Sequence, residues 1–308
     1  MNPRVALVHS DGYAISLDGL EKSHQFDSNK YGRIFRRLVE DGLADPKRVH
    51  SPGSVSDADL LRVHTPRYVR ALRRGSGVSE ALEFPELGQI HADRLLSAVV
   101  MPHLLACGGT VLAARLSASH PVAVNLGGGY HHAMPDRGEG FCLVADIAVA
   151  VRAVQADCSV GRTLVIDLDV HQGNGTALIF ADDETVFTFS MHQANIYPIP
   201  KEFSDWDVEL ESGMKDIQYL ALLEKNLPEV FNLARPDVVF FQAGCDVLAG
   251  DPLAGLALTE GGVVRRDWMV VEHCLRRNVP VVMTLGGGYA RDSWRVQVES
   301  IKNLLQKC

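Results

Sequence analysis

Short runs of apolar and β-branched residues alternate along the chain with longer stretches of helical periodicity. Six runs predict strands: 4–9, 121–126, 163–169, 185–192, 237–243 and 279–285. Between and after them, helices are predicted over 92–117, 143–156, 216–233, 260–277 and 292–306. Runs such as VVFF and VPVVM are apolar at every position, which is typical of strands covered by helices on both faces. The pattern therefore predicts βαβ units and a wound α/β sheet.

The chain shows no internal repeat, low-complexity tract or linker, and we expect its 308 residues to form one catalytic domain, 1–308. Two segments, 75–89 and 196–213, have the weakest periodicity. We expect both to be long surface loops, of the kind that often border the active site in α/β enzymes.

Charge and cysteine usage narrow the class of protein. The net charge of −8 argues against a nucleic-acid-binding protein, and the basic cluster of Arg33, Arg36 and Arg37 fits a solvated helix face. The six cysteines are scattered without a CxxC pair, which favours free thiols in a reducing compartment. We find no signal-peptide pattern and no apolar run of about 18 residues, so we expect no membrane span and a cytoplasmic protein.

Polar residues gather where the predicted strands end. In open α/β sheets, ligands bind beyond the carboxyl ends of the strands. Five strands are followed there by His, Asp, Gly or Tyr, in the segments GGGYHHAMPDRGEGFC, DLDVHQGNG, SMHQ, CDVLAGDPLAG and LGGGYARDSW. The sequence thus predicts a functional site at this edge of the sheet.

Asp167, Asp169 and His171 alternate along an extended segment, so their side chains share one face. Two carboxylates and an imidazole held together in a buried position need a cation, and this donor set suits Zn²⁺ or Mn²⁺. The alternative is a carboxylate pair held by backbone N–H groups beside a structural histidine. Asp246, at the end of another apolar strand, is the candidate third ligand, although a loop turn would also explain it. Asp251, followed by Pro252, fits turn chemistry.

His131 and His132 follow three glycines, and no GK[ST] pattern supports a phosphate-binding loop. A histidine pair beside a metal-bound water suits acid–base catalysis, while a role as metal ligand stays open. Tyr289 follows a second glycine run and is a candidate donor to an oxyanion. His192 also ends a strand, and we interpret it as structural.

At this point four motifs resemble one family. GGGYHHAMPDRGEGFC, DLDVHQGNG, GCDVLAGDPLAG and LGGGY resemble the zinc-dependent histone deacetylases and their bacterial relatives, in the same order along the chain. GLEKSHQFDSNKYGRI, VHTPRYV and HQGNG look most like the class IV branch, and the chain looks like a bacterial member. The resemblance implies the arginase–deacetylase α/β fold, with a central, mostly parallel sheet of about eight strands flanked by helices.

The resemblance also implies roles for individual residues. Asp169, His171 and Asp246 would bind one catalytic Zn²⁺, with His131, His132 and Tyr289 as catalytic residues. The implied substrate channel comprises Gly140, Phe141, Tyr197, Leu253 and Gly287. The implied structural K⁺ site comprises Asp167, Asp169, His171, Ser190 and Met191, and a second K⁺ site would lie near Phe180, Asp183 and Val186.

Two residues, Gln25 and Asn174, differ from those common in the family. His24 is followed by Gln25 where many relatives have His-Pro. Asp167 would support His131, whereas Asn174 stands beside His132 where an Asp is common and cannot carry its charge. The division of roles between the two histidines is therefore open.

The implied activity is zinc-dependent removal of an acetyl or longer fatty acyl group from the side-chain amide of acyl-lysine in proteins or peptides, with an acetylpolyamine as a further substrate. Hydroxamate-type inhibitors would bind the zinc. Two other classes of protein are alternatives. An arginase-like enzyme needs two Mn²⁺ and a D-x-D pattern where this chain has Cys245-Asp246-Val247, and a non-catalytic acyl-lysine binder would lack a ligand or the tyrosine.

Overall fold

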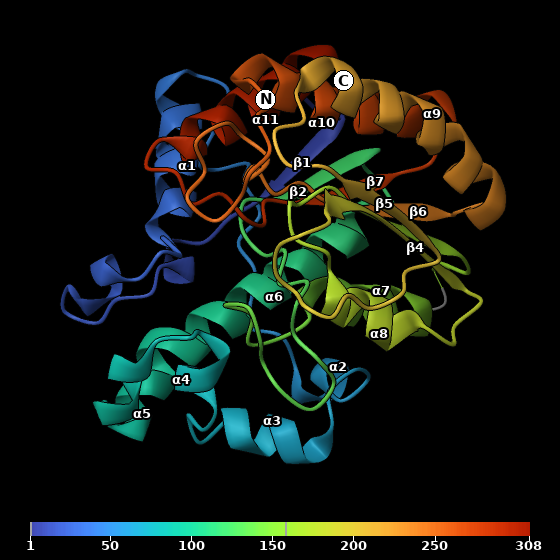
Figure 1. Ribbon diagram of the computed structural model, residues 1–308. Coiled ribbons are helices and arrows are strands. Elements are labelled where there is room, and N and C mark those ends of the chain that lie inside the picture. The colour runs from blue at the N-terminus through green and yellow to red at the C-terminus, as the bar shows by residue number, and fades with distance from the viewer. Residues whose placement is uncertain (1, 158) are drawn as a thin grey trace.

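The computed structural model describes residues 2–157 and 159–308, so Cys158 lies outside the described residues. Its centre is a sheet of seven parallel strands in the order β1-β2-β7-β6-β3-β4-β5 (Figure 1). The strands are β1 (Val5–Val8), β2 (Val122–Asn125), β3 (Thr163–Asp167), β4 (Val186–Gln193), β5 (Trp206–Leu210), β6 (Val238–Gln242) and β7 (Val281–Thr284). The predicted α/β class and all six predicted strands are confirmed, with seven strands in place of about eight.

The strand that the sequence did not reveal is β5. It pairs with β4 at one edge of the sheet, inside the segment 196–213 that was predicted to be loop. Four of its five residues are not fully buried, so the run WDVEL lacks the continuous apolar character of the central strands. That prediction is wrong for this part of the segment, because an edge strand buries less side-chain surface.

Helices cover both faces of the sheet, as Figure 1 shows: α1, α9, α10 and α11 on one face, and α6, α7 and α8 on the other. The helices are α1 (Asn29–Glu40), α2 (Asp57–Leu60), α3 (Pro66–Leu72), α4 (Val78–Ala81), α5 (Ala92–Leu95), α6 (Met101–Leu116), α7 (Asp146–Ala156), α8 (Asn174–Phe180), α9 (Asp216–Ala234), α10 (Glu260–Arg276) and α11 (Ser293–Lys307). The five predicted helices are confirmed, and the exposed Arg36 and Arg37 lie on α1 as expected.

The segment 75–89 is not the surface loop that was predicted. It forms α4 and a 3₁₀ turn, Pro85–Gln89. Five apolar side chains of this segment are buried: Val78, Ala81, Leu82, Phe84 and Leu87. Their spacing is too irregular to signal one helix, and their burial depends on the tertiary contacts around them.

The helix from Ala92 to Leu116 runs through α5, a π-helical turn at Leu96–Val100, and α6. By length and composition alone it could cross a membrane, but 72% of its most apolar window is buried inside the fold. It packs on α7, β1 and β2 and is accordingly a core helix.

The sheet order determines where the loops meet. Strands β2, β7, β6 and β3 are consecutive neighbours and all run in the same direction. The two glycine runs, and the two segments that carry the candidate metal ligands, follow these four strands. Because parallel strands end at the same edge, four segments that are distant in sequence converge there.

Candidate active site

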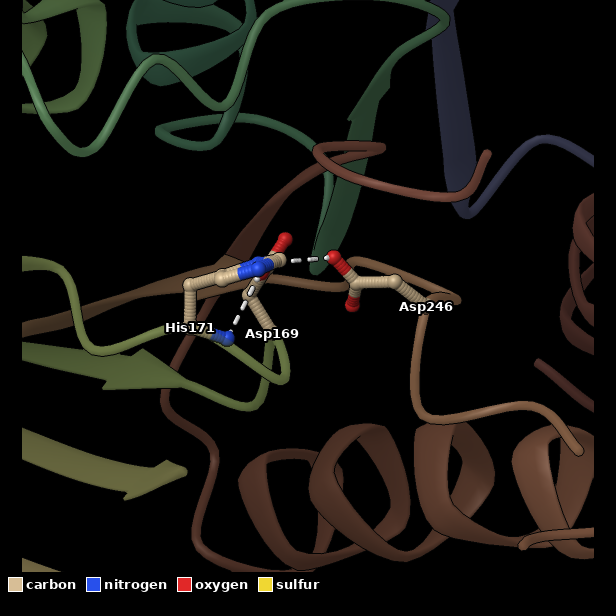
Figure 2. Close-up of side chains that lie close together, drawn as sticks. All are labelled: Asp169, His171 and Asp246. Carbon is tan, nitrogen blue, oxygen red and sulfur yellow. Dashed lines mark hydrogen bonds and ion pairs between the residues drawn. The ribbon is translucent and has the colours of Figure 1, made fainter. Parts of the chain in front are cut away.

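Asp169 and His171 follow β3, and Asp246 follows the neighbouring strand β6. Their side chains point toward one another, as Figure 2 shows, and one potential ligand atom from each lies within 4.8 Å of the others. The Nδ1 atom of His171 lies 3.2 Å from Asp169 Oδ1 and 3.2 Å from Asp246 Oδ2. All three are buried.

The donor set fits a divalent cation. Asp246 Oδ2 is buried and has no hydrogen-bond partner, while Asp246 Oδ1 accepts from the backbone N–H of Val170 at 2.9 Å. Burial and the neighbouring Asp169 raise the pKa of Asp246 to about 7. A buried carboxylate oxygen of this kind calls for a positive partner. Asp, His and Asp are ligands that zinc accepts.

Two glycines make room for this group. A Cβ atom at Gly287 would lie 2.1 Å from Asp246 Oδ2, and one at Gly244 would lie 2.0 Å from Asp169 Oδ2. The N–H of Gly287 also donates to Asp169 Oδ2 at 2.9 Å. Gly287 therefore lies directly against the carboxylates of Asp169 and Asp246, whereas the resemblance had placed it along the channel.

The structure brings His131 and His132 to this group, with ring centroids 4.0 Å apart. Nδ1 of His131 lies 2.7 Å from Asp167 Oδ2, and its Nε2 lies 3.8 Å from Asp169 Oδ1. Burial opposes a charge on His131, but the carboxylates of Asp167 and Asp169 outweigh it and raise the pKa to about 9. The carboxylate of Asp167 therefore favours the protonated form of this histidine.

His132 has the opposite electrostatics. Its Nδ1 lies 2.7 Å from Asn174 Oδ1, a neutral partner. Burial, together with His131 and His171, holds the pKa of His132 well below its ordinary value. The partners of the two adjacent imidazoles therefore shift their pKa values in opposite directions, as an acid and base pair requires.

Tyr289 lies near the same group, with its ring centroid 6.3 Å from that of His171. Burial and the carboxylates of Asp169 and Asp246 raise the pKa of its phenol well above the ordinary value, so it stays a proton donor. The carboxylate of Asp251 accepts from the N–H groups of Tyr289 at 2.8 Å and Ala290 at 3.2 Å. The turn residue Asp251 thus holds the tyrosine loop in place.

A cavity of about 220 Å³ leads to these groups. Its walls include four of the predicted channel residues together with His132, His171 and Tyr289. The predicted residues are Gly140, Phe141, Tyr197 and Leu253. Gln25 and Glu83 complete the lining. Five of the nine lining residues carry an aromatic or imidazole ring.

The structure also describes the residues of the two predicted K⁺ sites. Ser190 pairs in register with Asp167 on the adjacent strand, and its Oγ lies 2.9 Å from Nδ1 of His192. Met191 is buried beside it. Asp183 forms an ion pair with Arg152. Both K⁺ sites stay predictions.

Sequence reasoning missed several buried residues that support the site. Nζ of Lys30 donates to the carbonyls of Gly286 at 2.7 Å and Gly287 at 3.2 Å, beneath the tyrosine loop. Arg266 donates to the carbonyls of Leu168 and Gly244 at 3.0 and 2.7 Å. The sequence signal for Lys30 and Arg266 is a charged residue on the apolar face of a helix. That signal does not show which distant carbonyl groups the charged side chain contacts.

Asp146 plays the corresponding role for the histidine pair. Its carboxylate accepts from the N–H groups of Gly129 at 3.0 Å and Tyr130 at 2.6 Å and from Oγ1 of Thr110 at 2.5 Å. These bonds fix the backbone immediately before His131.

The histone deacetylase domain model matches residues 24–305. Histone deacetylase 2 of Arabidopsis thaliana is 36% identical over 98% of this chain and 79% of its own length. Histone deacetylase 8 of Xenopus tropicalis is 28% identical over 80% of this chain and 70% of its own length. The crystal structure of the HDA15 HD domain matches the fold with a TM-score of 0.78 at 22% identity, covering 98% of this chain and 91% of that one. These similarities support a deacetylase hydrolase function, and the chain belongs to the histone deacetylase domain family.

Proposed function

We propose that this protein is a zinc-dependent deacylase that removes an acyl group from the side-chain amide of an acylated lysine. The observation that carries the proposal is the buried group of Asp169, His171 and Asp246, in which one carboxylate oxygen makes no hydrogen bond, beside a cavity lined mainly by rings. These three residues would hold the zinc ion. When bound, zinc supplies Lewis-acid polarisation of a carbonyl and lowers the pKa of a water molecule.

The residues around the group suit amide hydrolysis. His132 is neutral, and Nδ1–H donation to Asn174 leaves the Nε2 lone pair to accept the proton of the attacking water. His131, kept cationic by Asp167, stabilises developing negative charge and is placed to protonate the leaving amine. The neutral phenol of Tyr289 donates to the oxyanion.

The cavity fits the substrate class. An acyl-lysine has a long apolar stem that ends in one polar amide, so it suits aromatic walls leading to a polar end. The rings of Phe141 and Tyr289 lie edge to face with centroids 5.9 Å apart, and Tyr197 stands 4.9 Å from the His132 ring. An unbranched methylene chain is what such walls accommodate.

Finer features of the proposal rest on the class IV resemblance. We propose a preference for fatty acyl chains over acetyl, one structural K⁺ ion near Asp167 and Ser190, inhibition by hydroxamates, a bacterial origin, a cytoplasmic location and a single catalytic domain over 1–308. The arginase-like alternative needs ligands for two Mn²⁺ ions, and it is disfavoured because the potential metal-ligand group found in the described part of the chain has three residues and Cys245-Asp246-Val247 offers a single Asp in place of D-x-D. A non-catalytic binder is disfavoured because Tyr289 and all three ligands are in place.

The test is a panel of lysine peptides carrying acyl groups from acetyl to myristoyl, assayed with added zinc and with a chelator. We expect chelator-sensitive turnover. In Tyr289→Phe we expect turnover to fall by about 10²- to 10³-fold while zinc content is retained, since one oxyanion donor is lost. Wild-type turnover in Tyr289→Phe would contradict the mechanism, and equal rates across chain lengths would contradict the long-acyl preference.

A further inference from the structure

Behind His132 and Asn174 lies a third polar side chain, Glu139, from the loop between the histidine pair and Phe141. Glu139 Oε1 accepts from Nδ2 of Asn174 at 3.0 Å and from the hydroxyl of Tyr197 at 2.8 Å. Its other oxygen accepts from Nε of Arg137 at 3.1 Å. Its side chain is 27% exposed, so the carboxylate is partly solvated.

The carboxylate determines which way the Asn174 amide points. An ionised carboxylate only accepts hydrogen bonds, so it must face the NH₂ end of the amide. Asn174 then has only its oxygen to offer His132, at 2.7 Å from Nδ1. Without Glu139, the amide could turn over and present its NH₂ group to the imidazole instead.

The amide orientation in turn determines the tautomer of His132. A neutral imidazole carries one N–H and one lone pair. Because Asn174 offers an acceptor to Nδ1, the proton must be on Nδ1 and the lone pair on Nε2. The reversed amide would favour the other tautomer, with a proton on Nε2 and no base to receive the proton of water.

We propose that Glu139 is a positioning residue that fixes the Nδ1–H tautomer of His132 through Asn174. The inference rests on the proposed function and deepens it, because it supplies what the neutral Asn174 lacks beside the general base. The negative charge of Glu139 does not contact the His132 imidazole directly. It contacts Asn174, which lies between them, and orients the Asn174 amide. His131 needs no such relay, since Asp167 bonds to it directly at 2.7 Å.

The same oxygen of Glu139 also links the relay to the channel. Tyr197 stands edge to face with His132 and donates to Glu139. Tyr197→Phe removes the channel side of this link and leaves the Asn174 side in place. It is the matched variant for separating the two contacts of Glu139.

The kinetic test is a double-mutant cycle in zinc-loaded enzyme with an acyl-lysine peptide. Glu139→Ala is expected to lower kcat about tenfold, the factor that one hydrogen bond to a charged group is worth. In an Asn174→Asp background the carboxylate accepts from His132 in either orientation and repels Glu139. There, Glu139→Ala is expected to leave kcat unchanged or raise it. The same tenfold loss in both backgrounds would show a merely structural role and overturn the proposal.

The second readout does not depend on turnover. Ring ¹⁵N NMR of the histidine-labelled, zinc-loaded protein distinguishes Nδ1–H from Nε2–H, and the His132 signal is assigned by its absence in His132→Ala. We expect Nδ1–H in the wild type and in Tyr197→Phe, and a mixture or Nε2–H in Glu139→Ala. An unchanged Nδ1–H tautomer in folded Glu139→Ala would refute the relay. Absence of any wild-type turnover would refute the proposed function instead, and the tautomer result would stand by itself.

Discussion

The carboxylate of Asp251 holds both the loop that carries Tyr289 and the backbone of Leu253, two residues that line the cavity. Oδ2 accepts from the N–H groups of Tyr289 and Ala290 at 2.8 and 3.2 Å, and Oδ1 accepts from the N–H of Leu253 at 3.0 Å. Asp251 is 5% exposed, so water does not compete freely for these bonds. Asp251→Ala removes all three acceptors at once.

The expected magnitude follows from these contacts. A hydrogen bond to a charged group contributes about 1.5–3 kcal/mol. Because Tyr289 and Ala290 are only half-buried, their N–H groups regain water in the variant, and we expect the free energy of unfolding to fall by about 3 kcal/mol. The phenol would also lose its position, and a displacement of about 1 Å can cost about 10²-fold in rate. We expect kcat to fall by about 10- to 100-fold.

The assay compares steady-state kinetics and urea unfolding of Asp251→Ala with those of Asp237→Ala. The Asp237 carboxylate also accepts from two backbone N–H groups, those of Gly161 and Arg162 at 2.9 and 2.7 Å, but it precedes β6 at the opposite end of the sheet. Asp237→Ala is expected to lose stability and keep kcat. If both variants keep wild-type kcat, Asp251 does not position Tyr289 and the reasoning fails.

Three further outcomes are expected. In Gly287→Ala the new Cβ would lie 2.1 Å from Asp246 Oδ2, so we expect the zinc bound per chain, measured by mass spectrometry, to fall sharply. The control Gly53→Ala places its Cβ in open space and should bind zinc normally. Burial lowers the pKa of His64 to about 4, so its neutral form stabilises the fold above pH 6.5. About 3 kcal/mol of that stability is lost as the pH falls from 6.5 toward 4, and urea unfolding should show a flatter pH dependence in His64→Gln. A chelator should lower the Tm of the wild type by several degrees, since zinc at 100 times its Kd stabilises the fold by about 2.7 kcal/mol. The Tm of Asp246→Asn, which lacks a zinc ligand, should change little when the chelator is added.

The central strands and long helices could be predicted because each carries its own signal. Runs such as VVFFQ in β6 are apolar at every position, and α10 and α11 have clear helical periodicity. The edge strand β5 and the short helix α4 could not be predicted, because they are short and only partly buried, and their apolar residues do not form a recognisable periodic pattern.

The site divides in the same way. The spacing of Asp169 and His171 predicted a metal pair, and the position of Asp246 after an apolar strand made it a candidate. Their meeting within 4.8 Å depends on β3 and β6 being neighbours, which is a property of the sheet order. Lys30 was missed because its carbonyl partner at Gly286 is 256 positions away.

By itself, then, the sequence determined the α/β class, most strands and helices, and the residue types gathered at the strand ends, because these follow from local periodicity and composition. Only the tertiary structure decided how charged side chains near the site are paired: Asp146 with the histidine loop, Arg266 with two carbonyls, and the partly exposed Glu139 with Asn174. Burial makes an unpaired polar group costly, and the partners of Asp146 and Arg266 are set by which segments the fold brings together rather than by distance along the chain.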